Sequence, residues 1–112
     1  GFGWVDRPVP PPLALAAAAA GIDAGALPDG YTFELRPRAA GFAGTLADSL
    51  GRGLALVVDY GGSRRELYHP ARSAGTLRCH YRHHAHDDPF LWPGLQDITA
   101  WVDFSAVAGT SA

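Results

Sequence analysis

Hydrophobic and polar positions along the chain change from helical to strand-like spacing near its middle. Between residues 38 and 50, Phe42, Leu46 and Leu50 recur every four residues with alanines beside them, which predicts an amphipathic helix. Residues 54–58 then form an uninterrupted apolar run of strand length. Such a run is typical of a strand covered on both faces, as in a parallel sheet. A helix, a glycine turn and a buried strand in this order predict an α/β fold with a doubly wound, mostly parallel sheet.

The first third of the chain carries weaker patterns. Residues 8–12 are rich in proline and predict an extended connector that leads into a helix. Residues 13–20 are strong helix formers, and Gly21 is a natural end for that helix. Residues 31–35 alternate with period two and predict a short strand.

The last half of the chain is mostly polar. From Gly61 to about Asp97 the composition predicts turns and loops, followed by a strand or extended chain at 98–104. A helix is expected to begin near Phe104. The sequence has no internal repeat, so we expect residues 1–112 to be a single segment of one domain.

Composition and charge exclude several classes of protein. Nine basic residues, all Arg, face eleven acidic ones, and a net charge of −2 argues against a nucleic-acid-binding role. No apolar stretch reaches the roughly 20 residues of a membrane helix, so we expect no membrane span. The single Cys79 cannot form an internal disulfide, which is consistent with a reducing compartment. The sequence shows no pattern of a cleavable leader and contains no Met, and we therefore expect it to be a segment of a longer protein.

A candidate site follows the apolar run, where Asp59 and Tyr60 precede Gly61 and Gly62. Ligands of open α/β sheets bind outside the carboxyl ends of the strands. Asp59 is therefore expected at such an edge, with the two glycines keeping the approach open. The alternative is a carboxylate that only caps a turn.

Residues 79–88 form a dense polar cluster with one Cys, four His and two Asp. Structural zinc sites usually draw ligands from two segments, but the only other histidine is the isolated His69, and no second Cys exists. We therefore expect no native metal, and a loop whose side chains orient each other or a substrate. The apolar loop at 89–94 either packs onto the domain or presents aromatic side chains to a partner.

Several short motifs occur in a characteristic order along the chain. They are Gly3–Val9, Asp59–Gly61, Gly75–His83, Asp87–Pro89, Pro93–Thr99 and Val102–Phe104. Together they resemble the MidA-type family of class I S-adenosylmethionine-dependent methyltransferases. The mitochondrial members of that family are protein arginine methyltransferases that act in the assembly of respiratory complex I.

The resemblance implies a Rossmann-like fold that is incomplete here, because the family's glycine-rich cofactor loop and acidic motif lie upstream of the matching residues. Residues 1–112 would then be the middle-to-late part of the domain. The resemblance implies S-adenosyl-L-methionine as cofactor, but it assigns no cofactor-binding residue in this segment. It implies a protein substrate such as a respiratory NADH dehydrogenase subunit, in the cytoplasm of a bacterium or the mitochondrial matrix of a eukaryote.

An arginine acceptor needs carboxylates to orient its guanidinium and aromatic faces to hold the cation. The expected catalytic residues are Asp59, Tyr60, Asp97 and His84. The expected substrate-binding residues are Gly61, Asp87, Gln96 and Trp92. The base among them stays unassigned. The alternative function is a non-catalytic assembly module that binds a partner protein through the His-rich segment and the loop at 90–92.

Overall fold

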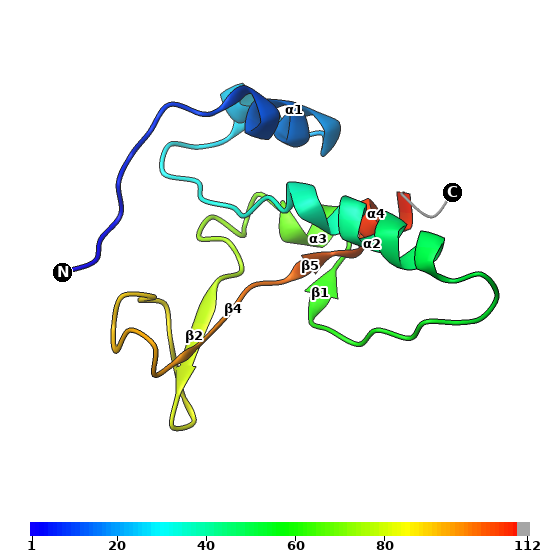
Figure 1. Ribbon diagram of the computed structural model, residues 1–112. Coiled ribbons are helices and arrows are strands. Elements are labelled where there is room, and N and C mark those ends of the chain that lie inside the picture. The colour runs from blue at the N-terminus through cyan, green and yellow to red at the C-terminus, as the bar shows by residue number, and fades with distance from the viewer. Residues whose placement is uncertain (110–112) are drawn as a thin grey trace.

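The computed structural model describes residues 1–109 (Figure 1). Its elements are α1 (Pro11–Ala19), the 3₁₀ helix η1 (Ala24–Ala26), α2 (Pro37–Ser49), β1 (Gly61–Gly62), α3 (Arg64–Leu67), β2 (Arg78–Tyr81), β3 (His84–His86), β4 (Asp97–Thr99), β5 (Val102–Asp103) and α4 (Phe104–Gly109). The strands form a parallel pair and a separate antiparallel sheet of three strands. This mixed α/β architecture agrees with the predicted fold class.

The predicted helices are confirmed. Helix α1 begins at Pro11, whose missing N–H falls in the first turn, where no intrahelical acceptor exists. It ends as expected at Gly21, which has a φ of 75° and donates to the carbonyl of Ala18 over 2.9 Å. Helix α2 also starts at a proline, Pro37, and carries the apolar spacing that predicted it. Helix α4 begins at Phe104.

The parallel pair joins two segments that are distant in the sequence. Gly61 and Gly62 of β1 lie opposite Val102 and Asp103 of β5. The pairing extends one residue further, because the amide of Val102 donates to the carbonyl of Tyr60 over 2.8 Å. Each strand runs directly into a helix, β1 into α3 and β5 into α4, and these two helices contact each other (Figure 1).

The expected central strand at residues 54–58 is wrong in this structure. No residue of this segment pairs with a strand among residues 1–109, and Leu54, Leu56 and Val58 are 90%, 83% and 88% exposed. A strand buried on both faces needs a neighbour on each edge and a layer above and below. The described residues supply one neighbour, β5, and it reaches only as far as Tyr60. The apolar run therefore lies in solvent.

The strand expected at residues 31–35 is reduced to one isolated bridge between Thr32 and Ala74. Its single ladder bond runs from the amide of Thr32 to the carbonyl of Ser73 over 2.7 Å. The partner segment turns away at Gly75, which has a φ of 73°. A period-two pattern predicts a strand only where a straight neighbour exists.

The segment expected to be mostly turns contains the hairpin sheet, which we define as β2, β3 and β4. The hairpin of β2 and β3 turns at Arg82 and His83, which have φ angles of 48° and 64°. Two-residue turns with two positive φ angles normally carry Asn-Gly or Asp-Gly. Arg-His gives no such signal, so the hairpin could not be predicted from local sequence.

Few side chains are buried. Among residues 1–109, the buried residues are Gly62, Leu67, Thr76, Cys79 and Asp103. The radius of gyration is 16.0 Å, whereas a compact domain of about 100 residues has one of about 13 Å. Among residues 1–109, no helix is long and apolar enough to cross a membrane. The chain is thus open, with an unusually small core for its length.

The contact between β1 and β5 can be tested at Gly61. A Cβ there would lie against the carbonyl oxygen of Val102 and 2.7 Å from a ring carbon of Phe104. We expect Gly61→Ala to lower the free energy of unfolding of the complete natural protein by about 1–3 kcal/mol, measured by urea denaturation. Gly44→Ala is the matched control, because α2 leaves open space around Gly44. It should raise stability by about 0.5–1 kcal/mol. Unchanged stability for Gly61→Ala would contradict the parallel pairing.

Candidate functional site

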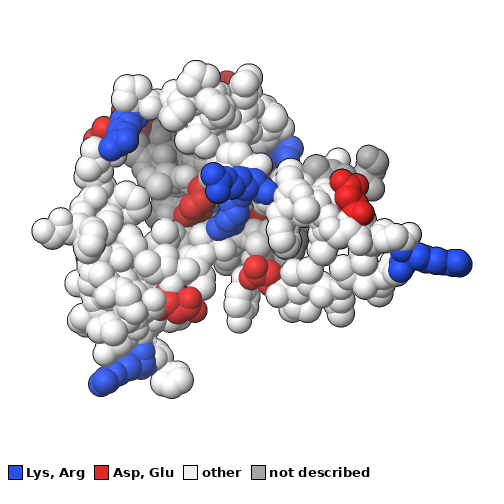
Figure 2. Space-filling view, in the orientation of Figure 1, with Lys and Arg blue, Asp and Glu red and all other residues white. Residues whose placement is uncertain are grey.

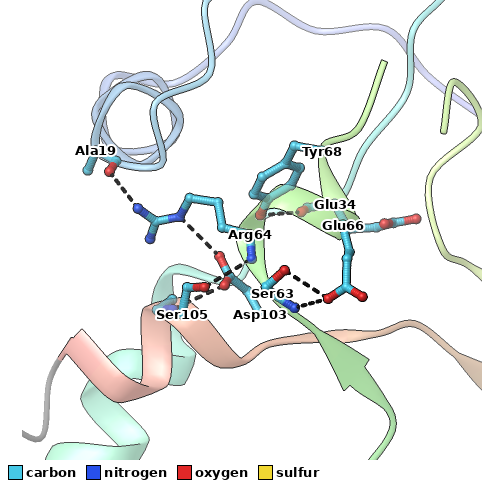
Figure 3. Close-up of polar contacts among 9 residues, drawn as sticks. Ala19, Glu34, Ser63, Arg64, Glu66, Tyr68, Asp103 and Ser105 are labelled. Carbon is cyan, nitrogen blue, oxygen red and sulfur yellow. Dashed lines mark hydrogen bonds and ion pairs between the residues drawn. The ribbon is translucent and has the colours of Figure 1, made fainter. Parts of the chain in front are cut away.

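Polar residues gather at the carboxyl ends of β1 and β5 (Figure 3). We call this set, Ser63, Arg64, Glu66, Asp103 and Ser105, the strand-end cluster. Arg64 lies at its centre, and its Nε is 3.5 Å from Oδ2 of the buried Asp103. The same guanidinium donates through Nη1 to the carbonyl of Ala19, and the backbone amide of Arg64 donates to Oγ of Ser105 over 3.0 Å. Arg64 thus ties α1, α3, β5 and α4 together.

The carboxylates of Asp103 and Glu66 also cap helices. Oδ1 of Asp103 accepts from the amide of Ala106 over 3.0 Å at the start of α4. Oε2 of Glu66 accepts from the amide and the hydroxyl of Ser63 over 2.7 and 2.8 Å, which closes a capping box on α3. These bonds from Ser63 hold the pKa of Glu66 below its usual value. Burial, followed by the charge of Asp103, raises the pKa of Tyr68.

The expected open approach over Gly61 is also wrong. The space where its Cβ would be is filled by Val102 and Phe104, and the space beside Gly62 is filled by Glu66 and Leu67. The strand-end cluster therefore satisfies its own charges and leaves no cradle beside these glycines. Its arrangement is that of a structural junction.

Asp59 and Tyr60 lie on the exposed segment just before β1. Oδ1 of Asp59 accepts from the adjacent amide of Tyr60 over 2.7 Å, and the Tyr60 side chain is 77% exposed. Asp59 also borders a pocket of about 610 Å³ whose other lining is mainly the apolar face of α2 and residues 53–57. The structure therefore keeps Asp59 accessible beside an apolar surface, and β1, which it precedes, lies apart from β2 and β4 (Figure 1).

The other five predicted site residues lie on the hairpin sheet or on the loop that joins β3 to β4. His84 and Asp97 are on the strands, and Asp87, Trp92 and Gln96 are on the loop. Asp97 of β4 lies opposite His80 of β2, and His84 of β3 lies opposite Tyr81.

Aromatic rings form one surface of this region. The rings of Tyr81 and Trp92 are 4.6 Å apart between centroids, and His86 meets Trp92 edge to face at 5.8 Å. The guanidinium of Arg82 lies 5.3 Å above the Tyr81 ring. The loop at 89–94 folds back, since Phe90 packs edge to face on Trp4 at 5.1 Å, although Trp92 stays 46% exposed. Packing onto the domain is therefore confirmed at Phe90, and presentation of Trp92 to a partner stays a prediction.

Polar groups around Asp88 fix the loop after β3. Its amide donates to Nδ1 of His86, its carbonyl accepts from Nε2 of Gln96, and its carboxylate accepts from the amide of Phe90. Nε2 of His86 and Oε1 of Gln96 are buried without a partner among the described residues. A donor and an acceptor are thus left over beside the aromatic rings.

Arg78 forms an ion pair with Asp87 on the exposed side of the sheet. Between the strands, Cys79 is fully buried, and this burial raises the pKa of its thiol, with Asp88 and Asp87 adding to the shift. Asp87 is therefore already paired with a cation, whereas Asp97 makes no ion pair within the described part of the chain.

Sequence reasoning missed Glu34, which organises the approach to the hairpin sheet. Its carboxylate accepts from the amides of Thr76 and Leu77 over 3.0 Å and from the hydroxyl of Thr76 over 3.1 Å. The Thr76 hydroxyl in turn accepts from the amide of Trp101 over 2.9 Å, and Arg36 donates to the carbonyl of Trp101. A lone Glu in an alternating segment gives no local signal for this role.

Comparison with known proteins gives a consistent result. A family model described as "Putative S-adenosyl-L-methionine-dependent methyltransferase" matches residues 1–112. No curated protein matches the chain.

Two crystal structures from Burkholderia thailandensis match closely. One is of a protein bound to S-adenosyl-homocysteine, and the other is a native structure of an uncharacterized protein. Each has 48% identity and a TM-score of 0.81 over 95% of this chain. The match covers 26% and 27% of the solved chains, so this chain spans about a quarter of their length. These matches support the resemblance as far as the methyltransferase family, and neither names the MidA type.

Metal content is a separate test of the polar cluster. Among residues 1–109, no group of three or more His, Cys, Asp or Glu side chains could hold a metal ion. We expect the purified complete protein to carry no stoichiometric zinc, because β2 and β3 hold the histidines without a second ligand-bearing segment. Elemental analysis checks this. One tightly held metal per chain that is lost in both His80→Ala and His84→Ala would contradict it.

Proposed function

Because the chain belongs to the family of S-adenosyl-L-methionine-dependent methyltransferases, we propose that it forms the acceptor-binding part of such an enzyme. The proposed acceptor is an arginine side chain of a protein. The observation that carries this proposal is the aromatic surface of the hairpin sheet, where the ring of Tyr81 already has a guanidinium, that of Arg82, above its face. A ring face that holds one guanidinium is suited to hold that of a substrate.

The cofactor supplies the methyl group, but residues 1–109 do not fit it on their own. In this family of folds a nucleotide cofactor needs a glycine-rich junction between a strand and a helix with free amides. The junction in this chain runs from β1 to α3. Its glycines are packed against Val102 and Glu66, and the amides around Ser63 and Arg64 are already bonded. We therefore propose that other residues, such as those in the remaining three quarters of the longer relatives, bind the cofactor.

The enzyme has to orient the acceptor guanidinium and exclude water around it. Asp97 of β4 makes no ion pair within the described residues, and a carboxylate can accept two N–H groups of a guanidinium in one plane. Because Asp97 lies opposite His80, it belongs to the other face of the sheet from Tyr81, so we propose it as a contact to the acceptor from the edge of the sheet and not as part of the aromatic surface. Trp92 and Gln96 would border the acceptor, and Asp87 would keep Arg78 in place.

His84 and the pair Asp59–Tyr60 remain proposed catalytic residues. His84 is exposed on β3, and a histidine is a common choice for the group that takes a proton from an acceptor. Asp59 and Tyr60 are exposed on the segment that leads into β1. We propose that a subunit of a respiratory NADH dehydrogenase is the first substrate to test, as the resemblance to the MidA type implies.

Cofactor binding is the first test. We expect the complete natural protein to bind S-adenosyl-homocysteine in calorimetric titrations. The Burkholderia thailandensis protein whose crystal structure contains this molecule is the positive control. Residues 1–112 on their own should bind it at least about 100-fold more weakly, because their strand–helix junction is filled. Tight binding by residues 1–112 would show that the cofactor site is misplaced. No binding by the complete protein would favour the assembly module.

Asp59 is the second test. The change Asp59→Asn should leave the melting temperature and S-adenosyl-homocysteine binding unchanged, because the side chain is exposed and an amide oxygen can still accept from Tyr60. Transfer of labelled methyl groups to protein should fall by about 100-fold or more, the scale expected for a lost positioning or acid–base group. Asp48→Asn, at an exposed carboxylate on α2, is the matched control and should behave like the wild type. Wild-type turnover in Asp59→Asn would shift the role to Asp97.

A further inference from the structure

An open pocket of about 620 Å³ lies beside α3, and none of the proposed catalytic or substrate-binding residues lines it. Its principal lining residues are Arg65, Glu66, His69, Arg72, Ser73 and Trp101. Figure 2 shows arginine side chains gathered near the middle of the molecule, over the region of α3. The pocket combines fixed cations with an aromatic wall, which is a combination that binds anionic groups.

Arg72 is held in one orientation. Its guanidinium carbon lies 4.5 Å from the centroid of the Trp101 ring, and its Nε donates to the carbonyl of Glu66 over 3.1 Å. Trp101 is fixed in turn by Thr76 and Arg36, which bond its amide and its carbonyl. The two Nη groups of Arg72 make no hydrogen bond within the described part of the chain. A guanidinium that is stacked and pinned at Nε presents its Nη donors at little further entropic cost.

The charges around Arg72 favour an anion. Arg65 is exposed and forms no ion pair with any described residue. Glu66 is the one acidic residue of the lining, and its carboxylate is engaged by Ser63. Two arginines and one glutamate give the pocket a formal charge of about +1, in a chain whose net charge is −2. His69 accepts from the amide of Ala71 at Nδ1, which leaves Nε2 as a further donor.

The position of the pocket indicates that the anion belongs to the polypeptide substrate. A second pocket of about 580 Å³ shares Arg72 and Trp101 with the first and continues to Arg78 and Asp87 on the hairpin sheet. The two pockets therefore connect the Arg72–Trp101 pair with Arg78 and Asp87, so a polypeptide whose arginine lies on the hairpin sheet can extend to this pair. A single positive charge matches a carboxylate better than a phosphate dianion, which needs more cations around it.

We propose that Arg72, assisted by Arg65, binds a carboxylate side chain of the protein substrate, so that the enzyme selects arginines accompanied by an acidic residue. The proposal rests on the proposed function, whose acceptor surface is the hairpin sheet. It adds a second contact point and defines the substrate class. The Arg72–Trp101 pair is then a specificity-determining element, remote from the group that receives the methyl.

The experiment measures binding of two fluorescent peptides to the complete natural protein by anisotropy. Each peptide has one arginine, and they differ only in carrying glutamates or glutamines on both sides of it. We expect the glutamate peptide to bind about 10-fold more tightly at low salt, which corresponds to about 1.4 kcal/mol. Arg72→Gln should abolish this preference, and Arg65→Gln should reduce it about 3-fold. Arg52→Gln, at an exposed arginine outside the pocket, is the matched control and should keep it.

Equal binding of the two peptides to the wild type would overturn the proposal, as would a preference that survives in Arg72→Gln. Tighter binding of a phosphoserine peptide than of the glutamate peptide would overturn the choice of a carboxylate. If Arg72→Gln fails to melt cooperatively, Arg65→Gln decides, because the exposed Arg65 side chain makes no hydrogen bond or ion pair with the described residues. Loss of methyl transfer to protein with an intact peptide preference would sink the proposed function and leave the pocket standing.

Discussion

The carboxylate of Glu34 is the interaction on which the arrangement of the chain depends. It binds the amides of Thr76 and Leu77 and the hydroxyl of Thr76, and that hydroxyl receives the amide of Trp101. Three segments separated by some 40 and 25 residues thus meet at one side chain. Bonds from neutral donors to a carboxylate are stronger than those between neutral groups, and Thr76 is buried, so losing them would leave unpaired polar groups. The hairpin sheet and the Arg72–Trp101 pair both depend on this junction.

Polar junctions are prominent because the chain has little apolar core. Leu67 and Cys79 are its buried hydrophobic residues, while Leu54, Leu56 and Val58 lie in solvent. Polar bonds of Arg64 hold α1, α3 and α4 together, as the bonds of Glu34 hold the turn at 75–77. A chain held in this way has well-defined local geometry, but its longest apolar run lacks cover within residues 1–109. An exposed apolar run of this kind fits a longer chain, such as those of the two Burkholderia thailandensis structures, in which further residues are present to pack against it.

The candidate site residues fall into two groups for a topological reason. Asp59 and Tyr60 precede β1 in the parallel pair, whereas His84 and Asp97 belong to the antiparallel hairpin sheet and Trp92 to the loop between β3 and β4. The connection between β4 and β5 is short, so the two sheets are linked but do not merge. Chemistry that used both groups would have to take place between the sheets. The pockets that meet at Trp101 lie along that connection, which is why a substrate running past Arg72 fits the architecture.

The sequence by itself determined helices α1, α2 and α4, the mixed α/β class and the methyltransferase family, but it missed α3, which lies in a segment predicted as turns and loops. Helix signals such as Pro37 at a first turn and Gly21 at an end act over a few residues, so they survive in any context. The tertiary structure alone decided the strands, because a strand exists only where a partner lies beside it. Residues 54–58 have strand composition without a partner, and the turn at Arg82 and His83 forms a hairpin without the usual residues. The same holds for the Arg72–Trp101 pair. Arg72 is held by a bond to Glu66, six residues away, but Trp101 is held by long-range bonds to Thr76 and Arg36, which no local pattern encodes.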